Sequence, residues 1–219
     1  MSHGQYFEAD RVSPAQLDVL WANGWRHFGT YFYRYWINVT REGVRHVLPL
    51  RIRLADFYLS ESQRRVRRRN RDLRVVIRPT ILDEDTHRLF ELHKQRFTDN
   101  VPDSLYTFLS EQPASVPCRN EEIAVYDGER LVAKSFLDIG KRATSSVYGV
   151  FDPEYAKRSL GILTMLIEIE YSRERGDEFY YPGYAYHEAS HYDYKKRFAA
   201  LEWFDWHGNW HALPNGHRG

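Results

Sequence analysis

The sequence predicts an α/β fold with a mixed, mostly antiparallel central sheet flanked by helices. Three β-rich runs follow one another in the middle of the chain, and the first two flank a strong turn signal. They lead into the longest helical pattern of the sequence, after which aromatic strands alternate with short helices. With 219 residues, 42% of them hydrophobic and 16% aromatic, the chain can bury one large core.

The first quarter of the chain predicts a helix and a hairpin. Residues 17–21 have helical periodicity, and the pattern ends near Gly24. Two aromatic or β-branched runs, 31–38 and 44–54, are joined through Arg41-Glu-Gly43. A short polar connection between two such runs is typical of a β-hairpin.

An arginine-rich segment follows the hairpin. Seven arginines fall between Arg64 and Arg74 with Asp72 as the single acid, so this window carries +6 and the rest of the chain sums to −5. Ser60 and Gln63 have the spacing of a capping box, and neither proline nor glycine interrupts the run. We therefore expect a helix here.

On this helix, Arg64, Arg67 or Arg68, and Arg71 would share one face, with Val66 on the opposite side. Concentrated positive charge attracts phosphate backbones, which favours a polyanionic partner. The alternative is a solvated surface helix. It fits poorly, because like charges four residues apart repel and nothing acidic offsets them.

The remaining elements alternate between helices and strands. They are, in order, a strand at 73–77, an amphipathic helix at 83–97 with Leu89, Leu92 and Phe97 inward, a short helix at 106–109, strands at 123–126, 131–139 and 143–151, a long helix at 159–175, a strand at 179–186, a short helix at 192–198 and a strand at 201–206. Asp127-Gly128 marks the first turn of the strand-rich block, and Gly176 is placed to end the long helix.

Three antiparallel strands followed by a turn, a helix, a strand, a helix and a strand is the order of acyltransferases of the GNAT type. In such a fold, the backbone N–H groups that begin the long helix can meet a phosphate or a carbonyl oxygen. We expect an N-terminal region over 1–80, a transferase core over 81–212 and a tail over 213–219, all in one compact unit.

The composition also excludes several classes. Cys118 is the only cysteine, which excludes an intramolecular disulfide framework and a cysteine-rich zinc site. Ten histidines are scattered without an evident ligand set, so we expect no metal. No apolar run resembles a signal peptide or could span a membrane, and we expect a cytoplasmic protein without a membrane partner.

At the level of local strings, the chain resembles the arginyl-tRNA–protein and leucyl-tRNA–protein transferases over about residues 4–210. The matching strings are Gly24-Trp25-Arg26 with Gly29 and Tyr33-Arg34; Pro49-Leu50-Arg51; Ser62-Gln63-Arg64-Arg65-Val66 through Asn70 and Asp72-Leu73; Asp127-Gly128 with Leu131-Val132-Ala133; Ser145-Ser146-Val147-Tyr148 through Asp152-Pro153; Ser159-Leu160-Gly161; Tyr181 with Gly183-Tyr184; and Tyr194-Lys195. Each string is weak alone, but their shared order and spacing make a strong signal.

The resemblance implies an enzyme that moves an amino acid, arginine or leucine, from a charged tRNA to a protein or peptide N-terminus. Aminoacyl-tRNA would be the co-substrate, with no other cofactor. Members of the family usually carry a cysteine pair where this chain has Val44 and Val47, and from this departure we expect no metal or iron–sulfur role for the N-terminal region. Pro182 and His191-Tyr192 also depart from the family pattern, and they leave the transferred amino acid and the acceptor open.

Attack of an amine on an aminoacyl ester needs a neutral amine, a stabilised oxyanion and aligned reactants. The predicted catalytic residues are Tyr148, Asp152, Leu160, Gly161 and Tyr184, with the backbone N–H groups of Leu160 and Gly161 as oxyanion donors. The predicted tRNA and substrate contacts are Arg64, Arg65, Arg67, Arg68, Arg71, Ser159, Tyr194 and Lys195. Each also has a structural interpretation: a packing glycine, a core tyrosine, an Asp-Pro turn or an exposed basic turn.

Two other functions fit parts of the sequence. An acetyl-CoA-dependent N-acetyltransferase needs a small residue in its pyrophosphate loop, where the string Arg158-Ser-Leu-Gly161-Ile-Leu163 places Leu163. A non-catalytic RNA-binding module would use the arginine helix and surface aromatics, but it would need neither the turn at Gly161 nor the tyrosine-rich strand.

Overall fold

The computed structural model describes residues 3–40, 43–98 and 101–213. The strands are β1 (His3–Glu8), β2 (Arg26–Phe28), β3 (Tyr31–Thr40), β4 (Gly43–Arg53), β5 (Arg74–Pro79), β6 (Asn120–Asp127), β7 (Arg130–Ile139), β8 (Ala143–Phe151), β9 (Phe179–Tyr186), β10 (Leu201–Phe204) and β11 (Trp210–Ala212). The α-helices are α1 (Pro14–Ala22), α2 (Glu61–Arg69), α3 (Glu84–Lys94) and α4 (Leu160–Glu174). The short 3₁₀ helices are η1 (Leu54–Asp56), η2 (Leu105–Thr107), η3 (Pro153–Arg158) and η4 (Asp193–Arg197).

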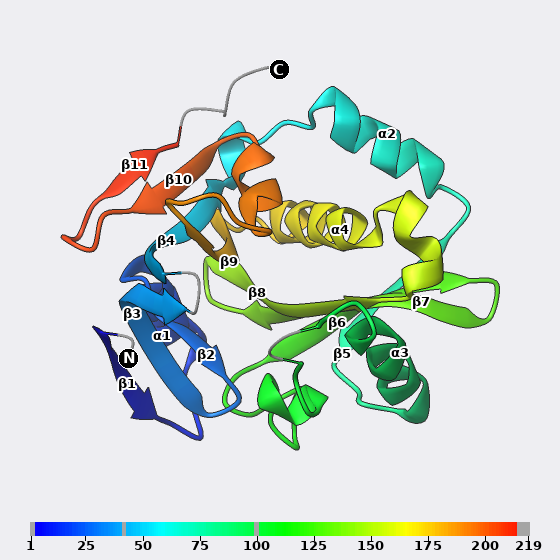
Figure 1. The fold of residues 1–219 in the computed structure, drawn as a ribbon, viewed down its shortest axis with the longest axis horizontal. Coiled ribbons are helices and arrows are strands. Elements are labelled where there is room, and N and C mark those ends of the chain that lie inside the picture. The colour runs from blue at the N-terminus through cyan, green and yellow to red at the C-terminus, as the bar shows by residue number, and fades with distance from the viewer. Residues whose placement is uncertain (1–2, 41–42, 99–100, 214–219) are drawn as a thin grey trace.

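All eleven described strands belong to one sheet, whose main path runs β1-β3-β4-β9-β8-β7-β6-β5. Strand β4, from the N-terminal region, pairs with β9, while β5 pairs with β6 at the far edge. The regions predicted at 1–80 and 81–212 therefore share one sheet. Helices α3 and α4 lie on opposite faces of its β7–β8 part (Figure 1). The GNAT-like α/β fold predicted from the sequence is confirmed.

Strands β8 and β9 separate soon after they begin. They are parallel and pair only over Ala143–Ser145 and Phe179–Tyr181. Beyond this point β9 stays paired with β4 as far as Tyr186, while β8 stays paired with β7 as far as Phe151. The two strands therefore diverge toward their carboxyl ends. We call the region between residues 146–151 of β8 and 182–186 of β9 the splay.

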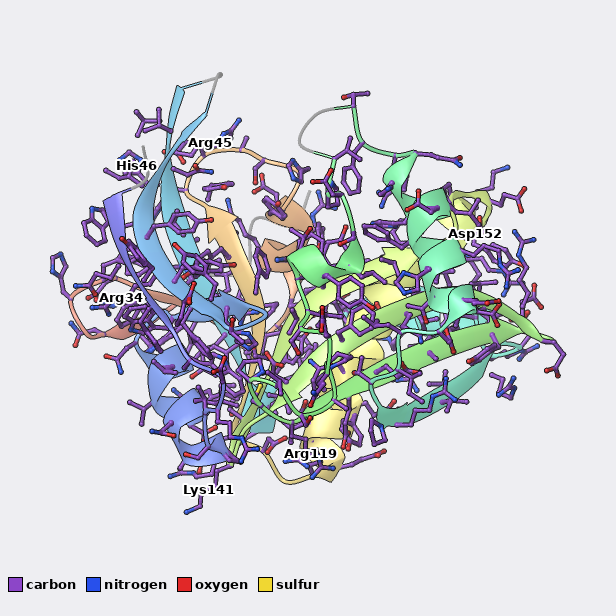
Figure 2. The ribbon with its side chains drawn as sticks, turned by 90° about the horizontal axis from the view of Figure 1, so that it is seen from below. Arg34, Arg45, His46, Arg119, Lys141 and Asp152 are labelled. Atoms are coloured by element: carbon purple, nitrogen blue, oxygen red, sulfur yellow. The ribbon has the colours of Figure 1, made fainter. Side chains whose placement is uncertain are left out.

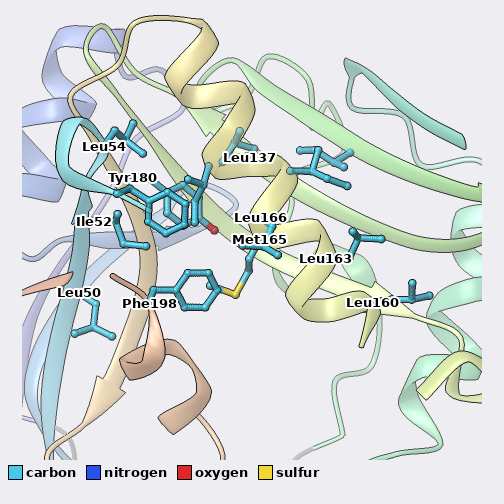
Figure 3. Packing of buried hydrophobic residues seen from close by; sticks show 14 of the residues in the cluster. Leu50, Ile52, Leu54, Leu137, Leu160, Leu163, Met165, Leu166, Tyr180 and Phe198 are labelled. Atoms are coloured by element: carbon cyan, nitrogen blue, oxygen red, sulfur yellow. The ribbon is translucent and has the colours of Figure 1, made fainter. Parts of the chain in front are cut away.

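The core lies between α4 and the sheet. The predicted stripe on the long helix is confirmed, because Leu160, Leu163 and Leu166 are buried in one cluster with apolar residues of β4, β7 and β9 (Figure 3). Helix α2 packs over α4 and covers its outer side. Burial on two sides explains why α4 is rich in apolar residues around most of its circumference, and it fixes where the helix begins beside the splay.

Helix α2 forms where the arginine run predicted it. The capping box is complete: Ser60 accepts from the Gln63 backbone, and the Gln63 side chain accepts from the Ser60 backbone. The helix is shorter than expected, because Asn70 ends it by donating to the carbonyls of Val66 (2.8 Å) and Arg158 (2.9 Å). Arg71 consequently follows the helix, and its expected place on one helical face with Arg64 is wrong.

Other differences are local. Helix α3 starts after Asp83, which caps it, and ends at Lys94, so Phe97 lies outside the helix and is 37% exposed rather than inward. His93 is buried instead, and its Nδ1 accepts from the Phe151 backbone at 3.0 Å. The sequence did not indicate β1, β2 or β11. The Arg41-Glu42 part of the hairpin turn, and all of the predicted tail except Leu213, lie outside the described residues.

A candidate active site at the splayed strands

The beginning of α4 has an unusual backbone. Ser159 adopts a left-handed conformation (φ 57°), and its carbonyl accepts from the N–H groups of Ile162 and Leu163 at 3.0 Å. The Leu160 side chain is fully buried, so only its backbone can serve a ligand. A Cβ added at Gly161 would lie 3.5 Å from the Phe151 ring, an ordinary contact. Packing therefore does not require glycine at position 161.

Asp152 occupies the turn between β8 and η3. Its buried carboxylate accepts from the Glu154 backbone at 2.9 Å and pairs with Arg130 at 2.5 Å. Asp152 therefore orders the Asp-Pro turn, which agrees with the structural interpretation of this residue. In Figure 2, Asp152 lies at the opposite end of the molecule from Arg34.

Tyr184, on β9, faces the N-terminal strands. Its hydroxyl donates to the Gly24 carbonyl at 2.5 Å, next to the Asn23 carbonyl that accepts from Arg34 at 3.0 Å. Burial raises the pKa of Tyr184 well above its usual value. The Tyr184 hydroxyl therefore lies at the Arg34 end of the molecule, and the structure does not bring it together with Asp152.

Tyr148, on β8, lies in the splay with a free polar atom. Its ring stacks on Phe108 with centroids 3.8 Å apart, and its buried hydroxyl has no hydrogen-bond partner among the described residues. Burial raises its pKa to about 12, so the hydroxyl stays protonated at neutral pH. A buried hydroxyl without a partner is costly, and a substrate oxygen or nitrogen could satisfy it.

Two charged residues at the base of the splay were missing from the predicted site. Arg26, on β2, donates to the Ser145 hydroxyl and to the Ser146 carbonyl. Glu168, on α4, is fully buried and accepts from the hydroxyls of Tyr180 (2.5 Å) and Ser146 (3.4 Å). Burial raises the pKa of Glu168 to about 7, so this carboxyl changes charge near neutral pH.

Lys195 reaches the same place from η4. Its Nζ donates to the Tyr184 carbonyl at 3.2 Å and lies 5.1 Å from the centre of the Tyr192 ring. A Cβ added at Gly183 would lie 3.2 Å from Lys195 Nζ and 3.7 Å from Arg26 Nη2. The two cations therefore converge on Gly183, whose φ of +94° and lack of a side chain allow their approach.

Burial lowers the pKa of Lys195 to about 7, and the positive charge of Arg26 adds to this shift. Glu168 acts in the opposite direction but does not cancel it. In the described part of the chain, no carboxylate lies within ion-pair distance of Lys195 or Arg26. The splay therefore combines a permanent cation with an amine and a carboxyl that both titrate near neutral pH.

An aromatic ladder along β3 leads to this cluster. Tyr31, Tyr33 and Tyr35 stack in series along β3, with centroids 6.1 Å and 5.8 Å apart. Tyr35 then meets the edge of Tyr184 at 5.4 Å. Tyr194, which belongs to the predicted substrate set, is 37% exposed in η4, beside Lys195.

The arginines of α2 and its C-terminal turn divide into paired and unpaired groups. Arg65 pairs with Glu61, and Arg67 pairs with Glu170 of α4 at 2.6 Å. Arg64 donates to a backbone carbonyl, and no described carboxylate lies within ion-pair distance of Arg64, Arg68 or Arg71. These last three are exposed and are the residues best placed to contact phosphates.

Three buried residues outside the splay could in principle hold a metal ion. The ligand atoms of His27, Cys118 and Asp138 lie within 4.8 Å of one another. Hydrogen bonds already link them: His27 Nε2 lies 2.8 Å from Asp138, Cys118 donates to Asp138 at 3.4 Å, and Asn120 donates to it at 2.9 Å. The expectation that the protein carries no functional metal stays a prediction.

The sequence carried weak signals for the missed residues. Arg26 stands in the string Gly24-Trp25-Arg26, which is one of the strings that carry the family resemblance. Glu168 is an acid within an otherwise apolar part of α4. An acid in a buried apolar stripe is a reasonable candidate for a functional site, because burying a carboxylate without a partner costs free energy. The His27 group had no local signal, since its members are far apart in sequence.

Comparison with known proteins identifies the family. A family model for the C terminus of arginine-tRNA-protein transferase matches residues 86–205. The chain is 30% identical over 199 residues to an aspartate/glutamate leucyltransferase of Acinetobacter baumannii, covering 88% of this chain and 70% of that protein. A protein of the same name from Helicobacter hepaticus is 28% identical, over 90% and 83% of the two chains.

The chain belongs to the arginine-tRNA-protein transferase family. It is therefore an aminoacyltransferase, an enzyme, and both alternatives from the sequence, the acetyl-CoA-dependent acetyltransferase and the non-catalytic RNA-binding module, are disfavoured. Among solved structures, L-PGS from Bacillus licheniformis matches with a TM-score of 0.50 and 12% identity, covering 85% of this chain and 53% of that one. FemX matches with a TM-score of 0.50 and 11% identity, over 86% and 65%. These two likenesses support the fold alone.

Within the described residues of this transferase, no helix is long and apolar enough to cross a membrane.

Proposed function

We propose that this transferase moves leucine from leucyl-tRNA to the α-amino group of an N-terminal aspartate or glutamate, in the cytoplasm. The observation that carries the proposal is family membership, together with relatives named aspartate/glutamate leucyltransferase. Arginine is the alternative amino acid, because the family model carries its name. Both reactions form an amide from an ester that tRNA charging has already activated.

Arg26 is the residue that we assign to an acidic acceptor side chain. It is a permanent cation at the base of the splay, and no described carboxylate pairs with it. A carboxylate brought to Arg26 would gain charge-assisted hydrogen bonds away from bulk water, each worth about 1.5–3 kcal/mol. That energy would favour N-terminal aspartate and glutamate over neutral residues.

The charged tRNA is assigned to the α2 side of the molecule. Arg64, Arg68 and Arg71 supply unpaired positive charge there, beside the ion-paired Arg65 and Arg67, and α2 packs over α4. Ser159 marks the start of α4, where the N–H groups of Leu160 and Gly161 would receive the oxyanion of the ester. Tyr148 would hydrogen-bond the reacting groups through its unpartnered hydroxyl.

The remaining assignments are more limited. Tyr194 lies beside the splay and is partly exposed, which suits contact with the substrate. Asp152 and Tyr184 are engaged by Arg130 and by the Gly24 carbonyl, so we assign them to shaping the site rather than to contacting the reacting atoms. No cofactor besides aminoacyl-tRNA is required by this chemistry.

The test uses leucyl-tRNA and arginyl-tRNA, each with peptides that begin with Asp, Glu, Asn, Ala or Lys. We expect leucine to be transferred to the Asp and Glu peptides, read by mass spectrometry. Arg26→Gln should reduce kcat/KM for the Asp peptide by about 10- to 150-fold, the loss of one charged hydrogen bond, and should change the Ala peptide little. Arg34→Gln is the matched control, since Arg34 lies on the neighbouring strand β3.

Transfer of leucine to no acidic peptide, with efficient transfer of arginine instead, would replace leucine with arginine in the proposal. Equal use of Asp and Ala peptides by the unmodified enzyme would remove the acidic acceptor from it. An equal loss with both peptides in Arg26→Gln would show that Arg26 supports the fold or the reaction but does not select the acceptor.

A further inference from the structure

Lys195 is the most exceptional side chain of the splay. An amine normally extends into water, but Lys195 Nζ turns inward to the Tyr184 carbonyl (3.2 Å) and lies over the Tyr192 ring. The neighbouring Lys196 does what lysines usually do, pairing with Asp193 at 2.9 Å. The fold therefore holds one lysine amine in place at the splay, without a carboxylate partner, while the next lysine in sequence is neutralised.

We propose that Lys195 is the proton carrier of the transfer reaction, taking a proton from the acceptor amine and returning it to the leaving ribose oxygen. The inference rests on the proposed function. The acceptor nitrogen attacks the ester carbonyl carbon and forms the new C–N bond. Its excess proton passes to the neutral Lys195 amine. The bond between the carbonyl carbon and the ribose oxygen then breaks, and the Lys195 ammonium protonates that oxygen. The proton is conserved, and no further reactant is needed.

The other polar groups of the splay are less suited to this role. Glu168 is fully buried and bonded to Tyr180 and Ser146, so it cannot touch a substrate. The Tyr184 hydroxyl is committed to the Gly24 carbonyl. Tyr148 has a pKa of about 12 and is a poor proton acceptor at neutral pH. The guanidinium of Arg26 carries only donors and has no atom that could accept a proton.

The surroundings of Lys195 keep its amine available in both protonation states. Arg26, on β2, disfavours the ammonium, and Glu168, on α4, favours it. The Tyr192 ring lies against the amine, Tyr194 is its neighbour in sequence, and burial raises the pKa of both tyrosines, so neither is charged at neutral pH. With burial included, the pKa of Lys195 is lowered to about 7, so both forms are populated under ordinary conditions. A proton carrier works best when its pKa lies near the operating pH.

Lysine labelling tests this geometry independently of turnover. The full-length protein is treated briefly with an amine-acylating reagent from pH 5.5 to 10, and labelling at each lysine is quantified by peptide mass spectrometry. The structure predicts that Lys195 labelling rises with a midpoint near pH 7. Lys196 serves as the internal control, because it is the next residue in the chain but its amine pairs with Asp193. A Lys195 midpoint above pH 9.5 would overturn the proposal, whatever the enzyme transfers.

Substitution tests the role in the reaction. Lys195→Arg keeps a cation of similar length that does not deprotonate near neutral pH, and Lys195→Met keeps only the apolar stem. With pre-bound charged tRNA and saturating acceptor, single-turnover rates should fall by roughly 10²- to 10⁴-fold in both variants. The Kd for tRNA and the thermal transition should change little. The break near pH 7 in the rate profile of the unmodified enzyme should be absent from both.

The acceptor amine also titrates, with a pKa of about 8. Acceptor peptides with N-terminal amines of different pKa distinguish the titration of the acceptor from that of Lys195. Only the break in the pH–rate profile that belongs to the acceptor amine should move when the peptide is changed. A Lys195→Arg enzyme with near-normal rates would assign the residue a purely electrostatic role. Loss of tRNA affinity in both variants would make Lys195 a phosphate contact. Either result would overturn the proposal, whereas absence of transfer by the unmodified enzyme would count against the proposed function itself.

Glu168→Gln provides a directional check. Because Glu168 raises the pKa of Lys195, its replacement by a neutral side chain of the same shape should move the Lys195 labelling midpoint and the rate break to lower pH together. A purely structural Glu168 would leave both midpoints in place. Shifts in opposite directions would show that the rate break belongs to another group, and the proposal would fail.

Discussion

The two positively charged regions of this enzyme, the arginines of α2 and its C-terminal turn and the Arg26–Lys195 pair of the splay, use charge in opposite ways. Arg64, Arg68 and Arg71 are exposed on the surface. Arg26 and Lys195 are packed among strands and aromatic rings, where Lys195 is held near its titration point. The surface region has many charges on exposed side chains, whereas the splay has few charges, which packing holds in fixed positions.

This difference indicates that tRNA binding and the transfer reaction can be altered separately. An exposed arginine contributes mainly long-range attraction, which salt screens within about 10 Å at 0.1 M ionic strength. A charge away from bulk water is screened much less and acts on specific atoms. We therefore expect changes on α2 to alter tRNA affinity, and changes in the splay to alter rates and pH dependence.

Apart from the Lys195 variants, the largest expected effect is on tRNA affinity. Reversing Arg64, Arg68 and Arg71 to Glu removes up to three phosphate contacts, so the Kd for tRNA should rise by at least ~100-fold. The slope of log K against log salt should flatten by about 3, measured by filter binding between 50 and 200 mM salt. Arg88→Glu on α3 is the control, because Arg88 is exposed on another face. An unchanged salt slope would mean that tRNA binds elsewhere.

A smaller effect is expected at the start of α4. Gly161→Ala should fold normally or gain up to about 1 kcal/mol, since its Cβ meets the Phe151 ring at 3.5 Å without a clash. Gly161→Val places two methyl groups beside the Leu160 and Gly161 N–H groups, and it should slow turnover by about tenfold or more if the ester binds there. Normal turnover in a folded Gly161→Val enzyme would move the aminoacyl group away from this turn.

The splay should also be visible in stability. The folded-state pKa of Glu168 is raised from 4.5 to about 7, so the folded protein binds this proton more tightly than the unfolded chain does. The free energy of unfolding should therefore fall as pH rises from 4.5 to about 7, by at most about 3 kcal/mol. Glu168→Gln should lack this fall, and urea titrations at pH 5 and pH 8 compare the two proteins. Parallel pH dependence in both would show that Glu168 does not titrate there.

The smallest effect concerns the His27–Cys118–Asp138 group. We expect elemental analysis to find no stoichiometric metal, and Cys118→Ser to keep transfer activity within about twofold, because a hydroxyl can still donate to Asp138. Stoichiometric zinc or iron in the purified protein, lost together with activity on chelation, would contradict this.

Local signals determined most of the fold before any packing was known. The Ser60–Gln63 capping box predicted where α2 begins, and the apolar stripe from Leu160 to Leu166 predicted the buried side of α4. These features depend on neighbours within one or two helical turns, so the sequence alone specifies them. The short strands β2 and β11 were not predicted, because the hydrophobic pattern of three residues does not distinguish a strand from a loop.

The site was predicted in part. Tyr148, Tyr194, Lys195 and the turn before α4 were named from the sequence, and the structure places the first three at or beside the splay. It also separates Asp152 from the Tyr184 hydroxyl, although both had been expected near one substrate. Sequence order cannot reveal this separation. Strands β8 and β9 diverge, so the distance between a residue of one and a residue of the other depends on how far each lies from the point of divergence.

By itself, the sequence determined the family, the GNAT-like element order and the concentration of arginine on one helix. The tertiary structure decided the rest. Arg26, Glu168 and Lys195 are 142 and 27 residues apart along the chain, yet the pairing of β9 with β4 and the packing of α4 bring them to one place. Their charge states also depend on that place, since burial and neighbouring charges shift a pKa, and both exist only once the chain has folded.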